Sequence, residues 1–445
     1  MRDAEVNSRS VRVAISCSIG IMLASGTAII GTFGIFMLPI LREFHWGRAQ
    51  ISGVVMTMSC TTALMAPVLG KLQDCWGARK ILLPGIVLYA ASVMLLSTAR
   101  GAIAQFYLLY FLVGIAATLI SIVPYTKVIS QWFHRTRGIV LALVGAGVSV
   151  GASLLPQVAR IFIGQYGWRG AYVGIGLLIV GVNLPVQILF LKESPPKSAA
   201  SPNEFRSEET SPEVRGMTAP EIRRSGIYWT LIGSIFLTTF VVGGVLAHLV
   251  PMMVDRGIRS AEATNALTLY ILGGIAGRLT MGRLLDRFSS PRVVFPFYLI
   301  AIAGLFILYT ARDPRVLALS GALIGVCSGA EGEFGPYLHS RYFGLRAFAE
   351  TYGLQFMFLA VANGLGPVAM GAVYDLSGSY WRMIFVHITL LAVAAGLLLS
   401  LSPYARVAHD QKTTQVRRKN HADRFFGVRF GRVARVRIGQ ENQGA

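Results

Sequence analysis

The sequence predicts an all-helical membrane protein with twelve transmembrane helices, arranged as two pseudo-symmetric bundles of six. Two observations carry this prediction. First, 54% of the 445 residues are hydrophobic and only 14% are charged, against about 25% charged in ordinary soluble domains. Second, the motif Gly-x-Leu-x-Asp follows an apolar block at Gly70–Asp74 and again, 212 residues later, at Gly282–Asp286. A polar turn repeated at about half the chain length indicates two copies of one membrane unit.

The apolar residues form long blocks, and the mean hydropathy of the chain is +0.58. A helix needs roughly 20 apolar residues to cross a bilayer, and lipid offers no hydrogen-bond partner to a backbone that is not helical. We therefore expect about twelve membrane-spanning helices. They lie near residues 13–40, 50–70, 81–99, 103–130, 138–163, 170–191, 227–252, 262–285, 293–311, 316–341, 349–374 and 382–402.

Two further landmarks repeat at nearly the same offset. Trp168 and Trp381 each precede an arginine after the fifth and eleventh blocks, and Phe133 ends the fourth block as Phe343 ends the tenth. Three landmarks with similar offsets predict a parallel duplication, an organisation found in one large class of secondary transporters. The predicted parts are an N-terminal tail at 1–12, a first bundle at 13–191, a linker at 192–226, a second bundle at 227–403 and a tail at 404–445.

The charges predict the orientation in the membrane. With both termini inside, most of the 41 Lys and Arg residues fall in inside segments, even when the tail at 404–445 is left out of the count. We therefore expect an integral protein of the cytoplasmic membrane with both termini in the cytoplasm, and topology explains the net charge of +20 without nucleic acid. The linker at 192–226 is rich in Pro, Ser, Glu and Arg, which favours a flexible segment. The basic tail is interpreted either as a lipid-binding segment or as an incidental extension.

The repeated turn carries a resemblance to a known family. The run Gly70-Lys71-Leu72-Gln73-Asp74 through Gly77, Arg79 and Lys80 resembles the signature loop between the second and third spans of the major facilitator superfamily. The second copy keeps the Gly, the Leu, the Asp and the following Arg. The resemblance implies twelve helices, alternating access and a gating role for these two loops. The residues to which it assigns that role are Gly70, Asp74, Gly77, Arg79, Gly282, Asp286 and Arg287.

A narrower resemblance points to one branch of that superfamily. The stretch from Trp132 to Gly151 resembles the fifth-span signature of monocarboxylate porters, and Arg278–Gly282 is similar to the segment with the substrate-binding arginine of those porters and of oxalate:formate antiporters. However, Gly274 replaces the acidic residue one turn before this arginine. The first span has no lysine, and neither has the block at 349–374. The resemblance therefore does not imply how transport is coupled.

Charged residues inside predicted spans are the candidates for substrate binding, because a charge at the bilayer centre costs at least about 2.5 kcal/mol. Arg278 lies eight residues before Asp286, whereas the equivalent position before Asp74 is Ala66, so the repeat itself does not require this cation. A guanidinium binds a carboxylate through two parallel hydrogen bonds, which suits an organic anion. The alternative is an arginine that pairs structurally or extends to the interface. Further substrate-binding candidates are Lys127, Tyr125 and Asn363.

Glu331 and Glu333 lie in the tenth predicted span. Residues two apart on a helix point about 200° apart, so we expect one carboxylate to face the transport pathway and the other to pack elsewhere. Either carboxylate, or the nearby His339, is a candidate for proton coupling or ion pairing. A lone histidine is also commonly a packing residue.

The combined features predict a secondary active transporter that moves a small organic anion, a mono- or dicarboxylate, with or without protons. The alternatives are a carrier of drugs or sugars, and a transporter-like sensor without transport. No enzymatic activity, cofactor or metal site is expected. The chain has no phosphate-binding Gly-x-x-x-x-Gly-Lys-[Ser/Thr] loop, no nucleophile–base constellation and no metal-ligand spacing among its four cysteines. The oligomeric state is left open, with a monomer as the simplest case.

Overall fold

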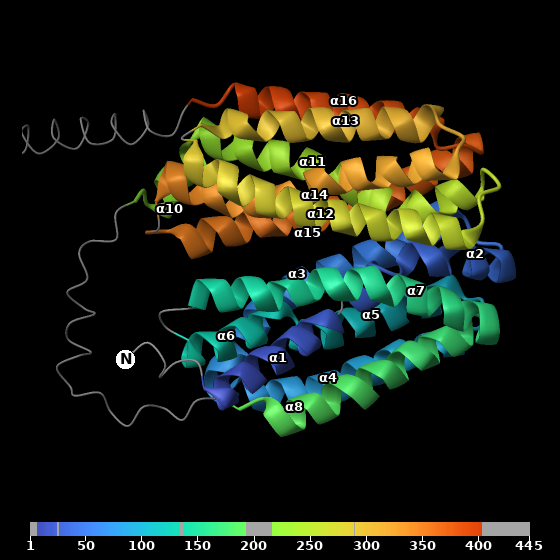
Figure 1. Cartoon of the computed structure of the whole chain (residues 1–445), viewed down its shortest axis with the longest axis horizontal. Helices are drawn as coiled ribbons and strands as arrows, with labels where there is room; N and C mark the ends of the chain where they lie inside the picture. The colour runs from blue at the N-terminus through green and yellow to red at the C-terminus, as the bar shows by residue number, and fades with distance from the viewer. Residues whose placement is uncertain are drawn as a thin grey trace, which may run out of the picture.

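The computed structural model describes residues 7–24, 26–133, 137–192, 216–288, 290–344 and 346–402. Within them the chain is almost entirely helical, and long helices run side by side in two groups (Figure 1). We call the end where the first helix begins and the linker emerges the linker face, and the opposite end the far face.

The first half runs from α1 to α8. Its first span is interrupted by a π-helical turn at Gly26–Ile30, and its last long helix contains Gly167, whose φ of 69° breaks the helix into two spans. Only glycine adopts such a φ without strain. The α-helices are α1 (Ser8–Met22), α2 (Phe33–Phe44), α3 (Arg48–Trp76), α4 (Ala78–Leu95), α5 (Ile103–Leu119), α6 (Ile122–Trp132), α7 (Arg137–Leu178) and α8 (Leu184–Phe190).

The second half repeats this order with fewer interruptions. A short 3-10 turn at Pro291–Val294 precedes its third span. Its helices are α10 (Ala219–Arg224), α11 (Gly226–Val254), α12 (Ser260–Arg287), α13 (Phe295–Thr310), α14 (Pro314–Phe343), α15 (Phe348–Ser377) and α16 (Trp381–Leu399).

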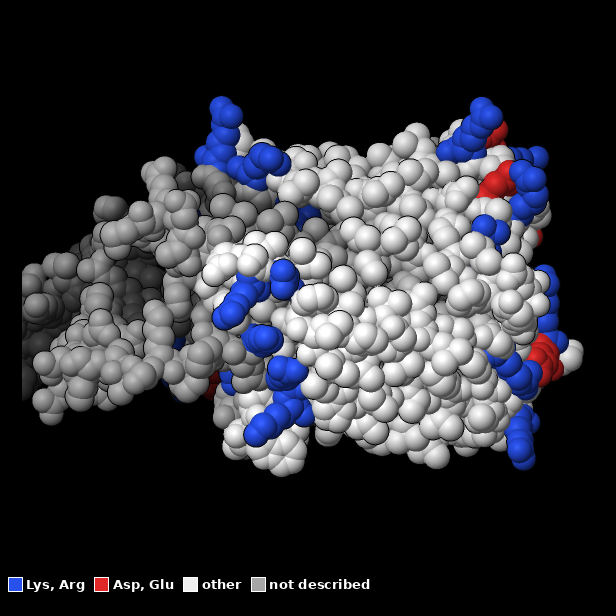
Figure 2. Space-filling model, turned by 60° about the horizontal axis from the view of Figure 1, so that its bottom comes forward, with Lys and Arg blue, Asp and Glu red and all other residues white. Residues whose placement is uncertain are grey.

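Ten helical segments in the described part of the chain are long and apolar enough to cross a membrane. One of them, Gly147–Phe190, contains the break at Gly167 and therefore supplies two spans. The polar helix α12 has the length of a span, but residues such as Glu262, Arg278 and Arg283 lower its hydropathy. When α12 is added and the divided segment is counted as two spans, the described part of the chain has twelve spans. The predicted all-helical fold is confirmed. In Figure 2, Lys, Arg, Asp and Glu gather at the two ends of the molecule and leave an uncharged band between them, as a bilayer requires.

Each half has its own apolar core. One cluster of buried side chains runs from Val13 to Leu191 and also includes Ala247, and the other runs from Ile222 to Leu401 and also includes Ile35. The segment predicted as a flexible linker, 192–226, is described only at its ends. Its last part is ordered, contrary to expectation, because Thr218 and Glu221 form a capping box that starts α10, and Ile222 is fully buried against the second half. Residues 193–215 and the tail at 403–445 lie outside the described residues.

The two halves meet through three pairs of helices, α3 with α15, α7 with α12, and α2 with α11. The hydrogen bonds that join them, from Gln157 to Asn265 for example, lie toward the far face. Phe356 lies on the same side of α15 as Asn363, two helical turns closer to the linker face. Its side chain is 51% exposed. The halves therefore touch on the far side and separate toward the linker face. We call the space between them there the opening.

The helices α12 and α14 approach each other more closely than side chains allow. A Cβ on Gly277 would lie 1.9 Å from the carbonyl oxygen of Val326, and one on Gly329 would lie 1.8 Å from that of Gly274. These positions require glycine, since no larger residue fits between the two backbones. The close contact fixes the height and rotation of α12 and therefore the position of Arg278.

Candidate functional site

The Arg278 guanidinium is paired with the carboxylate of Glu333. Arg278 lies on α12 and Glu333 on α14, and Nε of the arginine is 3.1 Å from Oε1 of the glutamate. The side chains are 46% and 41% exposed, so neither charge is enclosed by protein. A cation that keeps free donors and an accessible surface inside a membrane span can accept a second anion.

The Arg278 side chain extends toward the side of α14 that lies between α12 and α15. Its Nη2 atom is 3.3 Å from the position that a Cβ on the exposed Gly332 would occupy. Both α12 and α15 contact the first half, so the surface between them faces that half. Tyr352 of α15 lies within electrostatic range of Glu333 and Glu331. The ion pair is thus located beside the opening and not on the outer surface of the bundle.

The two glutamates of α14 have different surroundings. Glu331 is buried, and the hydroxyl of Thr239 on α11 donates a hydrogen bond to its Oε1. Glu333, two residues later, points to α12 and the opening. Their separation follows from helix geometry. One carboxylate is held inside the bundle, and the other is available to exchange partners.

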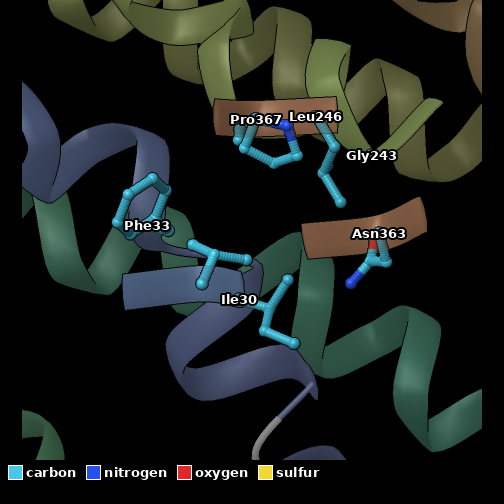
Figure 3. A pocket seen from close by; sticks show the side chains of 8 residues that line it. Ile30, Phe33, Gly243, Leu246, Asn363 and Pro367 are labelled. Carbon is cyan, nitrogen blue, oxygen red and sulfur yellow. The ribbon is translucent and has the colours of Figure 1, made fainter. Parts of the chain in front are cut away.

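Asn363 lies at a small pocket between the halves (Figure 3). Its amide Nδ2 is 3.5 Å from the Ser59 hydroxyl of the first half, and its carboxamide is the polar side chain among apolar ones. The pocket is lined by Ile30, Phe33 and Val55 from the first half and by Gly243, Leu246, Ala247, Asn363 and Pro367 from the second. Such a site, apolar with one polar group, suits the hydrocarbon part of a small molecule.

Two predicted binding residues, Tyr125 and Lys127, and the coupling candidate His339 lie away from the Arg278–Glu333 pair. Tyr125 is fully buried in the core of the first half, where its ring fills the space left by Gly20. Lys127 lies two residues after Tyr125 on α6. Its side chain is partly buried and interacts with another group. His339 is buried near the linker face, with its ring nitrogens 3.1 Å from Gln355 Oε1 and 2.8 Å from Thr351 Oγ1. In this conformation Tyr125 and His339 are packed between helices.

The repeated turn lies at the linker face in both halves. Gly77 separates α3 from α4 with a φ of 83°, and Arg79 donates a hydrogen bond to the carbonyl of Ile188, 2.9 Å away. In the second copy, a Cβ on Gly282 would meet nothing within 4 Å, and Arg287 is exposed at the end of α12. The helical backbone of Gly70, Asp74 and Asp286 is described, but their side-chain surroundings lie outside the described residues.

Sequence reasoning missed a charged cluster that joins the halves at the far face. We call it the Arg48 cluster, and it consists of Arg48, Asp255, Tyr374, Asp375 and Tyr380. Arg48 Nη1 and Nη2 donate to the two carboxylate oxygens of Asp255 at 2.6 and 2.9 Å. The guanidinium also lies 3.6 Å from the centre of the Tyr374 ring and donates to the Tyr380 hydroxyl. The Arg48 side chain is only 9% exposed.

Asp375 adds a second connection at the same place. Its carboxylate accepts hydrogen bonds from the backbone N–H groups of Arg48 and Ala49, at 2.8 and 2.9 Å. These groups begin α3, so a residue of the second half caps a helix of the first. The sequence does carry a signal for the cluster, because Asp255 stands 212 residues after Glu43 and its charge therefore occupies a repeated position.

Comparisons with known proteins show the family of this chain. The Major Facilitator Superfamily profile matches residues 17–264 and 236–434, which together cover most of the sequence. The chain belongs to the major facilitator superfamily. It is therefore an integral membrane protein of a transporter family, as predicted.

Relatives of this superfamily member include monocarboxylate transporters. The chain is 24% identical to monocarboxylate transporter 11 of Mus musculus over 360 residues, which cover 77% of each chain. It is 25% identical to the MFS-type transporter YcxA of Bacillus subtilis over 394 residues, 84% of this chain and 90% of that protein. These similarities support the predicted monocarboxylate-like branch.

A solved structure shares the fold. It is a bacterial homolog of the human lysosomal transporter Spinster, in an inward-facing and occupied conformation. The TM-score is 0.67 at 15% identity, over 90% of this chain and 96% of that one. At this level of identity the likeness concerns the fold alone.

Proposed function

We propose that this protein is a secondary active transporter of a small organic anion, a mono- or dicarboxylate, that works by alternating access between its halves. We further propose that it lies in the cytoplasmic membrane with the linker face in the cytoplasm. The many Lys and Arg residues of the segments at that face support this orientation.

The Arg278–Glu333 pair beside the opening is the observation that carries the proposal. A guanidinium can bind two carboxylate oxygens in parallel, but among the described residues Arg278 makes one short contact, from Nε to Glu333. We propose that its other donors bind a substrate carboxylate. Because Glu333 already occupies part of the guanidinium, a substrate anion competes with it, and a proton on Glu333 would relieve that competition. In the monocarboxylate-porter pattern an acidic residue stands at the position of Gly274. Here Glu333 supplies a carboxylate to Arg278 from α14 instead.

The pocket around Asn363 supports a small, partly apolar substrate. It is lined by both halves and is mostly hydrocarbon. A carboxylate on Arg278 and an alkyl or aryl group directed toward this pocket would contact both bundles at once. A ligand with that arrangement can bias the equilibrium between conformations, because its contacts change when the halves move.

Uptake into proteoliposomes tests the proposal. Wild type, Arg278→Ala and Arg283→Ala are supplied with a panel of radiolabelled mono- and dicarboxylates, and with a neutral sugar and a cationic drug. Arg283 is a matched control, since it is exposed on the same helix and its Nη1 donates to the Leu279 carbonyl, 3.4 Å away. We expect Arg278→Ala to lower carboxylate uptake about 100-fold, since losing a charged two-point contact costs about 3 kcal/mol.

Three results would contradict the proposal. If Arg278→Ala transports the same carboxylate with unchanged affinity, the arginine is a structural residue. If wild type carries the sugar or the drug and no carboxylate, the substrate class is wrong. If nothing moves under any imposed gradient while the protein remains folded, the sensor alternative is favoured.

A further inference from the structure

His248 is buried directly beneath the Arg48 cluster, at the contact between the halves. It lies on α11 and is fully buried. Its Nδ1 atom is 2.9 Å from the Tyr380 hydroxyl, and its Nε2 atom is 3.0 Å from the carbonyl oxygen of Pro367 and 3.1 Å from the Ser52 hydroxyl. Ser52 belongs to the first half, so the imidazole is part of the contact that closes the far face.

These contacts fix the protonation state of the ring in this conformation. A carbonyl oxygen only accepts, so Nε2 must carry a proton that it donates to Pro367. Tyr380 can then donate its hydroxyl proton to Nδ1, while its oxygen accepts from Arg48 Nη1. Every donor between Arg48 and Pro367 therefore has an acceptor when the imidazole is neutral.

A second proton on His248 would disrupt this chain. Nδ1–H and the Tyr380 O–H would then point at each other, and the hydroxyl would have to rotate away. Two cations, the imidazolium and the Arg48 guanidinium, would converge on one hydroxyl oxygen in a buried site. The cost falls on the closed far face, since that contact brings Arg48 to Tyr380.

The other charged and titratable groups around His248 do not offset that added charge. From α3 the ring faces Arg48, and from α16 it faces His387, whose ring nitrogens have no hydrogen-bond partner among the described residues. Asp255 on α11 is paired with Arg48, and Asp375 on α15 caps α3. Tyr374 places its ring against Arg48, and its hydroxyl interacts with Asp255. No described carboxylate contacts the imidazole.

The internal repeat shows that this arrangement is specific to the second half. The position of the first half equivalent to His248, 212 residues earlier, is Phe36, whose ring stacks on Tyr172 in the core of the first half. At the offset of 213 the partner of Tyr380 is Gly167. The bundle fold itself therefore needs neither the imidazole nor the hydroxyl.

We propose that His248 is a proton-binding site that controls the far face, which closes when the imidazole is neutral and opens when it binds a proton. The inference goes beyond substrate binding at Arg278, because it concerns the opposite end of the molecule. Pro367 is shared between His248 and the pocket of Figure 3. A proton taken up from the far side while that face is open would be released when it closes, so the site would link proton movement to the conformational cycle.

The test needs no substrate, so its outcome is separate from that of the uptake experiment. Spin labels at Ala102 and Arg312, exposed in equivalent far-face loops of the two halves, report the distance between those loops in a background without the accessible Cys60 and Cys75. As the pH falls we expect wild type to shift from the short to the long distance, by up to about tenfold in population per pH unit for a single linked proton. His248→Gln should remove this shift. His387→Gln, which changes an equally buried histidine, should retain it.

Tyr380→Phe provides a second, independent variant in case His248→Gln does not fold. It keeps the ring but removes the hydroxyl through which His248 acts on Arg48, so we expect more of the long distance at neutral pH and a weaker response to acid. A wild type whose distances do not change with pH would overturn the proposal. A His248→Gln variant that keeps the full response, or a His387→Gln variant that loses it, would also overturn it.

Discussion

The two halves each end their first span with a carboxylate at the far face, but the two carboxylates bind different partners. Glu43 contacts Trp168 and Arg169 of its own half, with 2.6 Å between its Oε2 and the indole nitrogen. Asp255, the equivalent residue of the second half, is paired with Arg48 of the first. The corresponding arginine, Arg382, lies over the Trp381 ring instead.

This difference separates the charges that hold a bundle together from those that act between bundles. The Glu43–Arg169 pair is a property of one folded half. The Asp255–Arg48 pair joins the two halves, so we expect it to break when the far face opens. Arg278 is a further charge that the repeat does not require, because the equivalent position in the first half is Ala66, but its partner Glu333 belongs to the same half.

The largest expected effect concerns the contact of α12 with α14. Gly277→Val places methyl groups against the Val326 carbonyl, where even a Cβ would lie 1.9 Å away. We expect a loss of more than about 4 kcal/mol, enough to prevent a stable fold. Gly282→Ala is the control, because its Cβ meets nothing within 4 Å. Size-exclusion profiles and melting temperatures in detergent measure both, and equal stability of the two variants would mean that this close contact is unimportant.

Arg48→Ala against Arg169→Ala tests the comparison of the two carboxylates directly. The buried Arg48 pair joins the halves, so its loss should shift the far-face distance distribution toward the open form by about 2 kcal/mol, roughly thirtyfold. Arg169 and Glu43 are 41% and 40% exposed, and their loss should cost at most about 1 kcal/mol of stability without moving the distances. Equal shifts in the two variants would remove the distinction between the halves.

Exchange of the two charges is a smaller and sharper test. Arg48→Asp alone should open the far face, and Asp255→Arg in the same protein should restore part of the closed population. Recovery should be incomplete, because an arginine at position 255 loses the position over Tyr374 that Arg48 has at 3.6 Å. The same distance measurement reports it. A double variant as open as Arg48→Asp alone would show that the pair is not what closes this face.

The smallest effect is expected at α10. Thr218→Ala removes the hydroxyl that caps this helix, with an expected loss of about 1 kcal/mol in the local stability of α10. The hydrogen-exchange rate of the backbone amides of residues 219–224 should rise, while the exchange rate of the α11 amides should stay unchanged. If exchange in α10 does not change, the order of this segment does not depend on its cap.

The sequence was sufficient for the fold, because apolar length and the repeated turn are local properties of the chain. It also led to the prediction of Arg278 as a binding residue, because the equivalent position of the first half is the uncharged Ala66. It did not predict that Glu333 would pair with Arg278, since this depends on how closely the glycines bring α12 to α14. The Arg48 cluster was missed for a related reason. Its residues lie in polar segments at the ends of spans, where charge is ordinary, and only the packing of the halves brings them together.

The effect of Glu333→Gln on carboxylate uptake tests the central claim most directly. If Glu333 competes with the substrate for Arg278, removal of its charge should lower the KM for the carboxylate about tenfold, which corresponds to about 1.4 kcal/mol. Glu331→Gln, which alters the buried neighbour, should not lower the KM. A Glu333→Gln variant whose KM is unchanged or raised would contradict the account.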